Sequence, residues 1–257
     1  MIIDGPSLLL FMFILARVIG CFILMPFFSE RSISQMIKLI LAIWVSVILF
    51  YTIPKTVLIP QHYLEMIIAF LNEFMLGLFI GLIARFIFYG IQLSGSLMDM
   101  QLGLSVAAAF DPSTGSQETI MSRLMYMTAI VIFLLIDGHH LLLTGLFESF
   151  KAIPLFSETT YPLGLQMLGD LGAKMFFIAV TISMPIIIII FMLDFSLGLL
   201  ARLAPQVNVF FLGFQIKPML GTFIFLLMIP TIVSKIVVIM DDLAIQIVNF
   251  FHSIVVL

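Results

Sequence analysis

The residues best suited to chemistry in this sequence are one short string and a scattered set of charges. The string is Asp137-Gly138-His139-His140. Adjacent histidines point about 100° apart on a helix, so they are not expected to share a metal ion as an i, i+4 pair would. The sequence also has no His-Glu-x-x-His, no Gly-x-Ser-x-Gly and no glycine-rich phosphate loop. We therefore predict no catalytic, cofactor-binding or metal site, and we interpret the string as a polar corner between helices.

The charges lie inside apolar stretches rather than beside them. Arg17, for example, lies midway along the apolar run Ser7–Phe28. The others are Lys38, Glu73, Arg85, Asp99, Arg123, Lys174 and Asp194. A charge at the centre of a lipid-facing helix costs at least ~2.5–3.5 kcal/mol. We therefore expect these groups to face protein or water, in helices that are largely wrapped by other helices.

These charges have two interpretations. They could form a proton or ion relay, because ionisable residues inside a membrane are functional candidates. They could instead pair with opposite charges or helix-end carbonyls on neighbouring subunits. Lys and Arg number 11 and Asp and Glu number 14, and this near balance favours pairing. The residues predicted to make inter-subunit polar contacts are Arg17, Glu30, Arg31, Lys38, Arg85 and Arg202.

Composition excludes several classes of protein. Of 257 residues, 63% are hydrophobic and 10% are charged, whereas soluble domains have about 25% charged residues. The net charge of −3 offers no basic surface for nucleic acid. One cysteine allows no internal disulfide. No polar linker divides the chain, so we predict one all-α, membrane-associated domain over residues 1–257.

Proline and glycine divide the chain into expected helices. Ser7–Met25 is expected to be a retained first helix, because the N-terminus lacks the positive region of a signal peptide. The other expected helices are Ile33–Tyr51, a long helix or pair over Gln61–Ser105, Gln117–Ile136, His139–Phe150, Gly164–Leu203 with a kink at Pro185, and a last hairpin or long helix over Pro218–Phe251 with a kink at Pro230. Leu203–Lys217 is predicted to be a loop. Close helix approaches are expected at Gly77 and Gly81, and around Gly90, Ser94 and Gly95.

The segment Val106–Gly115 is the strongest functional candidate. Asp111-Pro112 disfavours helix, and small residues lead to one bulky side chain, Phe110. An apolar loop inserted in a pore can close it by excluding water, and Gly103 and Gly115 could act as hinges. The alternative is a connector tucked against the core, and the pattern alone does not separate the two.

Four strings in order resemble those of the FliR/SctT family of the type III secretion export apparatus. They are Pro26-Phe-Phe-Ser-Glu-Arg-Ser-Ile-Ser-Gln-Met-Ile-Lys38, Gln101-Leu-Gly-Leu-Ser-Val-Ala-Ala-Ala-Phe-Asp-Pro112, Asp137-Gly-His139 with Ser149-Phe150 and Pro154, and Arg202-Leu-Ala-Pro-Gln-Val-Asn-Val-Phe-Phe-Leu-Gly-Phe214. The Asp-Gly-His corner looks more like the flagellar members than the injectisome members.

The resemblance implies a non-enzymatic subunit without cofactors. Family members join FliP-like and FliQ-like subunits in a hetero-oligomeric helical export gate, which also engages an FlhB-like subunit. The gate lies at the bacterial inner membrane in the flagellar basal body, much of it stands above the bilayer plane, and unfolded flagellar proteins pass through it. Helical hairpins with Pro-kinked long helices are implied.

The resemblance also assigns a channel plug. Its residues are Val106, Ala107, Ala108, Ala109, Phe110, Asp111 and Pro112, with Gly103 and Gly115 as plug hinges. Relatives have bulky apolar residues where this chain has three alanines, so the seal is expected to depend on Phe110.

Two rival functions make different predictions. A stand-alone multi-pass transporter, coupled to protons or a solute, tends to have inverted repeats, and no clear repeat is found in this sequence. An intramembrane protease would bring two of Asp99, Asp137 and Asp194 together in one cavity.

Overall fold

The computed structural model describes residues 5–26, 28, 33–53, 62–105, 119–156 and 165–255, and of these it leaves the side chains of 165–167 and 243–255 undescribed. Every regular element in these ranges is a helix, which confirms the all-α prediction. Contacts divide the chain into two compact units. The first unit comprises Met1–Phe86, Asp137–Gly169 and Asp241–Leu257, and the second comprises Ile87–Ile136 and Asp170–Met240. Helix α3 contributes to both, and the single domain over 1–257 stays a prediction.

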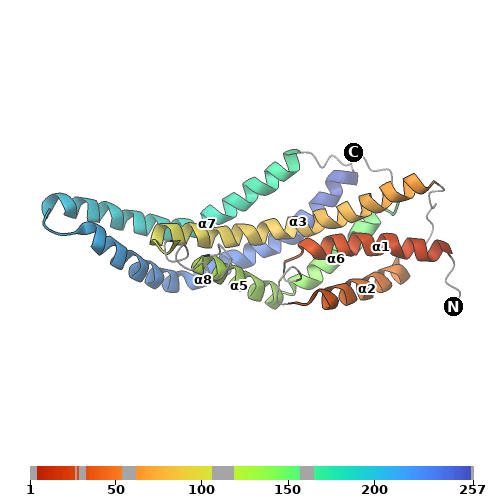
Figure 1. Cartoon of the computed structure of the whole chain (residues 1–257), viewed down its shortest axis with the longest axis horizontal. Coiled ribbons are helices and arrows are strands. Elements are labelled where there is room, and N and C mark those ends of the chain that lie inside the picture. The colour runs from red at the N-terminus through yellow and green to blue at the C-terminus, as the bar shows by residue number, and fades with distance from the viewer. Residues whose placement is uncertain are drawn as a thin grey trace. The chain divides into compact units, whose positions relative to one another are not determined.

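The first unit is built on α1 (Gly5–Leu24), α2 (Gln35–Thr52), the first part of α3 (Tyr63–Leu102) and α6 (Gly138–Ala152). Helix α1 buries Leu10, Ile14, Arg17 and Cys21, one turn apart along one face. This face lies against α3 (Figure 1). The two helices cross so closely that a Cβ at Gly77 would collide with the backbone carbonyl of Arg17. This confirms the close helix approach predicted at Gly77.

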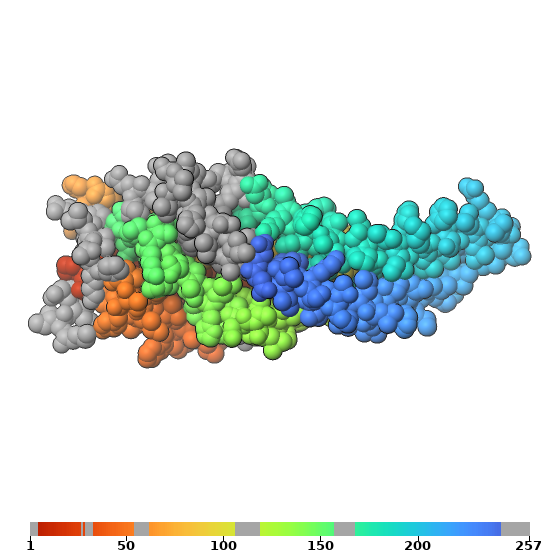
Figure 2. Space-filling view, turned by 180° about the vertical axis from the view of Figure 1, so that it is seen from behind, coloured from red at the N-terminus to blue at the C-terminus, as the bar shows by residue number. Residues whose placement is uncertain are grey.

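The second unit contains the rest of α3, α5 (Ile120–Leu135), most of α7 (Leu165–Leu203) and the part of α8 (Val209–Val255) up to Met240. Gly90 brings α3 against α7, since a Cβ there would lie 2.8 Å from the Met175 carbonyl oxygen. Helices α7 and α8 pack side by side as a hairpin (Figure 2). Lys235 on α8 donates a hydrogen bond to the Thr181 carbonyl on α7, at 3.1 Å.

The last helix corrects one prediction. We expected a loop over Leu203–Lys217 and a helix from Pro218, but α8 already begins at Val209. The connection is short because Asn208 caps the new helix: its side chain accepts a hydrogen bond from the Phe211 N–H at 3.2 Å. Pro218 and Pro230 lie inside α8, as Pro185 does inside α7. These prolines therefore interrupt single backbone bonds without ending the helices.

Five described helices are long and apolar enough to cross a membrane, or up to six if the bent pair α5 and α6 counts as one. About 20 residues suffice for a span. The 40 residues of α3 reach ~60 Å at 1.5 Å per residue, about twice the thickness of a hydrocarbon core. Part of this helix must therefore lie outside the hydrocarbon.

The predicted corner at Asp137 is present. Helix α5 ends at Leu135 and α6 begins at Gly138, and Asp137 between them has a left-handed backbone with φ of 56°. This conformation is uncommon for a non-glycine residue, and Asp is among the residues that tolerate it best. The helix therefore breaks at the polar string, as the sequence indicated.

Candidate functional site

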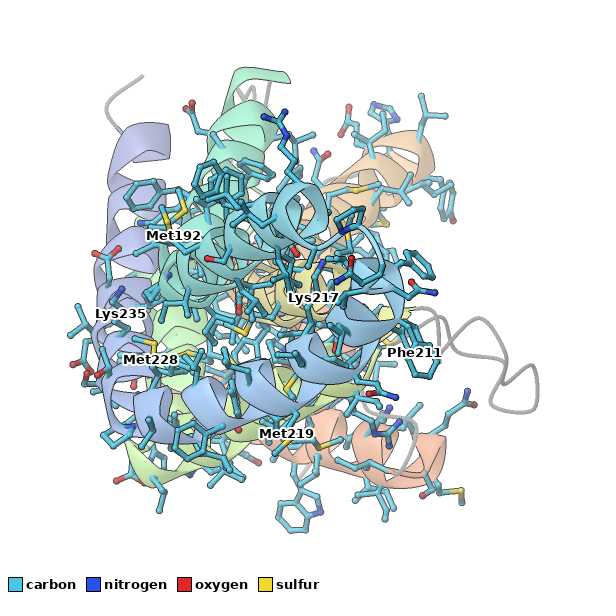
Figure 3. All side chains as sticks on the ribbon, turned by 90° about the vertical axis from the view of Figure 1, so that its left-hand side faces the viewer. Met192, Phe211, Lys217, Met219, Met228 and Lys235 are labelled. Carbon is cyan, nitrogen blue, oxygen red and sulfur yellow. The ribbon has the colours of Figure 1, made fainter. Side chains whose placement is uncertain are left out.

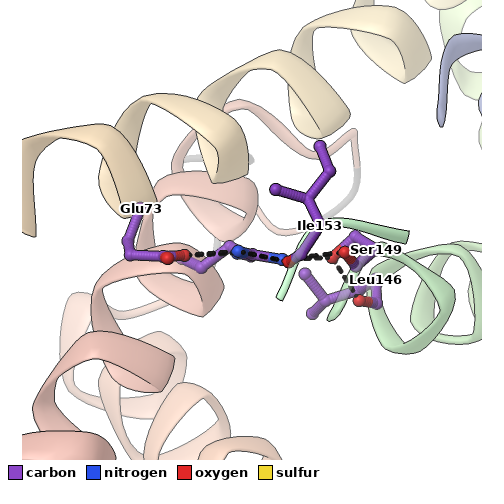
Figure 4. Close-up of polar contacts among 5 residues, drawn as sticks. Glu73, Leu146, Ser149 and Ile153 are labelled. Atoms are coloured by element: carbon purple, nitrogen blue, oxygen red, sulfur yellow. Dashed lines mark hydrogen bonds and ion pairs between the residues drawn. The ribbon is translucent and has the colours of Figure 1, made fainter. Parts of the chain in front are cut away.

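A buried ion pair organises the first unit. Arg17 and Glu73 lie on α1 and α3, with their side chains 0% and 5% exposed and 2.6 Å between Arg17 Nη2 and Glu73 Oε2. The guanidinium also donates to the Ser149 carbonyl at 3.0 Å and to the Ile153 carbonyl at 3.1 Å (Figure 4). It lies over the Phe150 ring, 4.1 Å from the centroid. One side chain of α1 thus connects α3 with the end of α6.

This geometry corrects the prediction for Arg17. We expected an inter-subunit contact, but its guanidinium is fully buried and bonds to Glu73, Ser149 and Ile153 of the same chain. The physical reason is that the end of α6 supplies carbonyl oxygens and Glu73 supplies the countercharge. The expectation that interior charges avoid lipid holds for Arg17, Glu73 and Asp99, which the chain itself buries.

The frame around the predicted plug begins at the end of α3. The Leu104 N–H donates to the Asp99 carbonyl at 3.0 Å, and the Gly103 N–H donates to the Met100 carbonyl at 3.4 Å. These two bonds, with φ of +75° at Gly103, form a Schellman cap. The positive φ of Gly103 is therefore explained by helix termination, and its role as a hinge stays a prediction.

The side chain of Asp99 reaches the start of α5. Its Oδ2 accepts hydrogen bonds from the backbone N–H groups of Met121 at 2.8 Å and Ser122 at 3.3 Å. Gly95 makes this possible, since it lets α3 and α5 approach closely. A Cβ at this position would lie 2.5 Å from the Met121 carbonyl oxygen. The residues on either side of segment 106–118 are thus joined by one carboxylate.

Beside this cap, the second unit has a pocket of about 300 Å³ lined by Leu102, Gly103 and residues of the α7–α8 hairpin. Its polar feature is the Lys217–Asp194 ion pair, 2.6 Å between Nζ and Oδ1. Leu102 packs onto Gly221, where a Cβ would collide with its side chain. The end of α3 therefore packs closely against α8.

The remaining predicted contact residues are only partly accounted for. Lys38 and Arg85 are half-buried and Arg202 is exposed. Glu30 and Arg31 lie outside the described residues, as do Val106, Ala107, Ala108, Ala109, Phe110, Asp111, Pro112 and Gly115. The inter-subunit and plug assignments of these residues stay predictions.

The polar corner differs from expectation in one detail. Ligand atoms of Asp137, His139 and His140 lie within 4.8 Å of one another, and the two imidazole centroids are 4.3 Å apart. The argument that neighbouring histidines diverge is therefore wrong at this helix start. The protease rival finds no support in the second unit, where Asp194 pairs with Lys217 and Asp99 with backbone amides.

Comparison with known proteins addresses the family directly. The model of "Bacterial export proteins, family 1" matches residues 8–243. The chain belongs to this family. It is similar to the flagellar biosynthetic protein FliR of Bacillus subtilis (strain 168), with 35% identity over 80% of this chain and 81% of the relative. FliR of Escherichia coli (strain K12) is 27% identical over 85% and 83%. The Yop proteins translocation protein T of Yersinia pestis is 29% identical over 82% of each chain. These findings confirm the predicted FliR/SctT resemblance.

Sequence reasoning missed the partners of the buried charges. Glu73 and Gly77 are four residues apart on α3, and so are Gly95 and Asp99. In each pair a glycine permits close approach and an acid on the same face meets the approaching helix. This glycine–acid spacing is the signal that could have identified both contacts.

Proposed function

We propose that this chain is a non-enzymatic subunit of the bacterial flagellar type III protein export gate. The observation that carries the proposal is the family match over residues 8–243 together with the FliR relatives. Five long apolar helices support a place in the membrane. We place the gate at the inner membrane in the flagellar basal body, with FliP-like, FliQ-like and FlhB-like subunits as partners.

Exposed apolar surface supports assembly with other helices. On the α7–α8 hairpin, Phe211 and Met219 point away from the hairpin, whereas Lys217 lies toward α7 (Figure 3). Phe211 is 58% exposed and Met219 is 80% exposed. Contiguous apolar surface of this kind belongs against protein or membrane rather than water. Partner subunits or lipid would cover it in the assembled gate.

We further propose that Val106–Pro112, with Gly103 and Gly115 as hinges, plugs the conduit through which unfolded flagellar proteins pass. Support comes from its two flanks, which are held together by Asp99 and seated on α8 through Leu102. Flanking helices fixed in this way would keep the plug at the channel at rest. Phe110 supplies the bulk that excludes water.

Phe110→Ala should raise the ion leak through the assembled gate, because removing the one bulky apolar side chain readmits water to the constriction. The measurement is conductance of the purified gate complex in planar bilayers. Phe177→Ala is the matched control, since this phenylalanine lies on α7 and is 70% exposed. Equal conductance in both variants and the unaltered gate would refute the plug.

A further inference from the structure

Asp99 has a buried carboxylate that the proposed plug does not itself use. It lies on α3, is 0% exposed, and both amides it binds belong to α5. In the described part of the chain its Oδ1 has no hydrogen-bond partner. A buried carboxyl group with an unpaired oxygen requires an explanation.

The start of α5 explains why this carboxylate is buried. The first N–H groups of a helix have no partner within it and normally depend on the side chain of the N-cap residue. Thr119 occupies that position in α5 but makes no capping hydrogen bond. Asp99 takes over this role from a different helix, and its negative charge also suits the positive end of the helix dipole.

The same residue closes the end of α3 through its backbone. Its carbonyl accepts the Leu104 N–H at 3.0 Å, while its carboxylate holds Met121 and Ser122. The last turn before segment 106–118 and the first turn after it therefore share one residue. Gly95, one turn earlier on the same face, brings the backbone of α5 within reach.

We infer that Asp99 is a positioning residue that fixes the spacing between the end of α3 and the start of α5, the two helices that flank segment 106–118. The inference deepens the proposed plug function and depends on it for its consequence in the gate. The contact itself is independent of that function, because it concerns only the described helices. Asp99 therefore acts on the segment through its two anchors.

Hydrogen exchange at the Met121 and Ser122 amides tests the contact. These amides lie in the first turn of α5 and lack partners in their own helix, so their protection depends on Asp99. In the full chain within its native complex, Asp99→Ala should speed their exchange about 10- to 100-fold, as expected for losing a hydrogen bond to a charged group. Asp99→Asn keeps an acceptor for the amides and should restore most of the protection.

Ser94→Ala is the matched control. Ser94 is also buried on α3, and its hydroxyl donates a hydrogen bond to the Ile91 carbonyl in its own helix, so exchange in α5 should not change. If Asp99→Ala does not accumulate, Gly95→Ala offers a second route. Its methyl group would press on the Met121 carbonyl oxygen, and the same two amides should exchange faster. Unchanged exchange in the tested variant, or equal acceleration by Ser94→Ala, would overturn the inference.

Gate conductance separates this inference from the proposed function. Asp99→Ala should raise leak and Asp99→Asn should restore it, if the segment is a plug whose anchors matter. Leak from Phe110→Ala with none from Asp99→Ala would overturn the positioning role and leave the plug in place. Faster amide exchange without leak in either variant would support the contact and reject the plug.

Discussion

Glu73→Ala should destabilise the chain by about 3–5 kcal/mol, the cost of leaving a buried charge without its partner. Arg17 is fully buried, so its guanidinium cannot turn to water when the carboxylate is removed. A loss of this size approaches the lower end of the range of whole-domain stabilities, about 5–15 kcal/mol. The full-length chain should therefore be strongly depleted from membranes, as measured by quantitative immunoblotting and by thermal aggregation of the purified complex.

Glu148→Ala is the control for this prediction. Glu148 pairs with Lys151 at 2.8 Å, but these side chains are 46% and 57% exposed, and exposed pairs contribute only about 0–1 kcal/mol. The chain should accumulate normally in this variant. Equal loss in both variants would show that the Arg17–Glu73 pair is not special to the fold.

Gly77→Ala should cost about 3 kcal/mol, the upper end of the range for overpacking. The added methyl group would collide with the Arg17 carbonyl, which belongs to the backbone of α1 and cannot rotate away. The shift would also displace the Arg17 guanidinium from Glu73. The measurement is the thermal unfolding midpoint of the purified complex, which should fall sharply.

Gly172→Ala gives the matched comparison, because a Cβ at this helical glycine meets nothing within 4 Å. Alanine is the better helix former by up to about 1 kcal/mol, so this variant should be neutral or slightly stabilising. A similar fall in both variants would contradict the close crossing of α1 and α3.

Helix positions were largely predictable from the sequence because proline and glycine mark their ends locally. Asp137-Gly138 predicted a break, and α5 ends and α6 begins at this position. The start of α8 was missed because Pro218 looked like a helix start, whereas Asn208 provides the actual cap. A mid-helix proline and a first-turn proline look alike without knowledge of the neighbouring turns.

Partners of the buried charges were not predictable in the same way. Arg17 meets residues 56 and 132 positions away, and nothing in local periodicity encodes such pairings. The sequence correctly indicated that these charges avoid lipid, but the partner of Arg17 was predicted to lie on another subunit. Asp99 was identified as an interior charge without its role at α5. The plug residues themselves were suggested by the family resemblance.

Photo-crosslinking tests the central claim, that exported polypeptide passes against residue 110. A photoreactive amino acid replaces Phe110, and an export substrate is stalled in transit by a stably folded fusion. The substrate should form an adduct at position 110 and none at position 44, where Trp44 lies 64% exposed on α2. Adducts absent from position 110, or equally strong at position 44, would contradict the account.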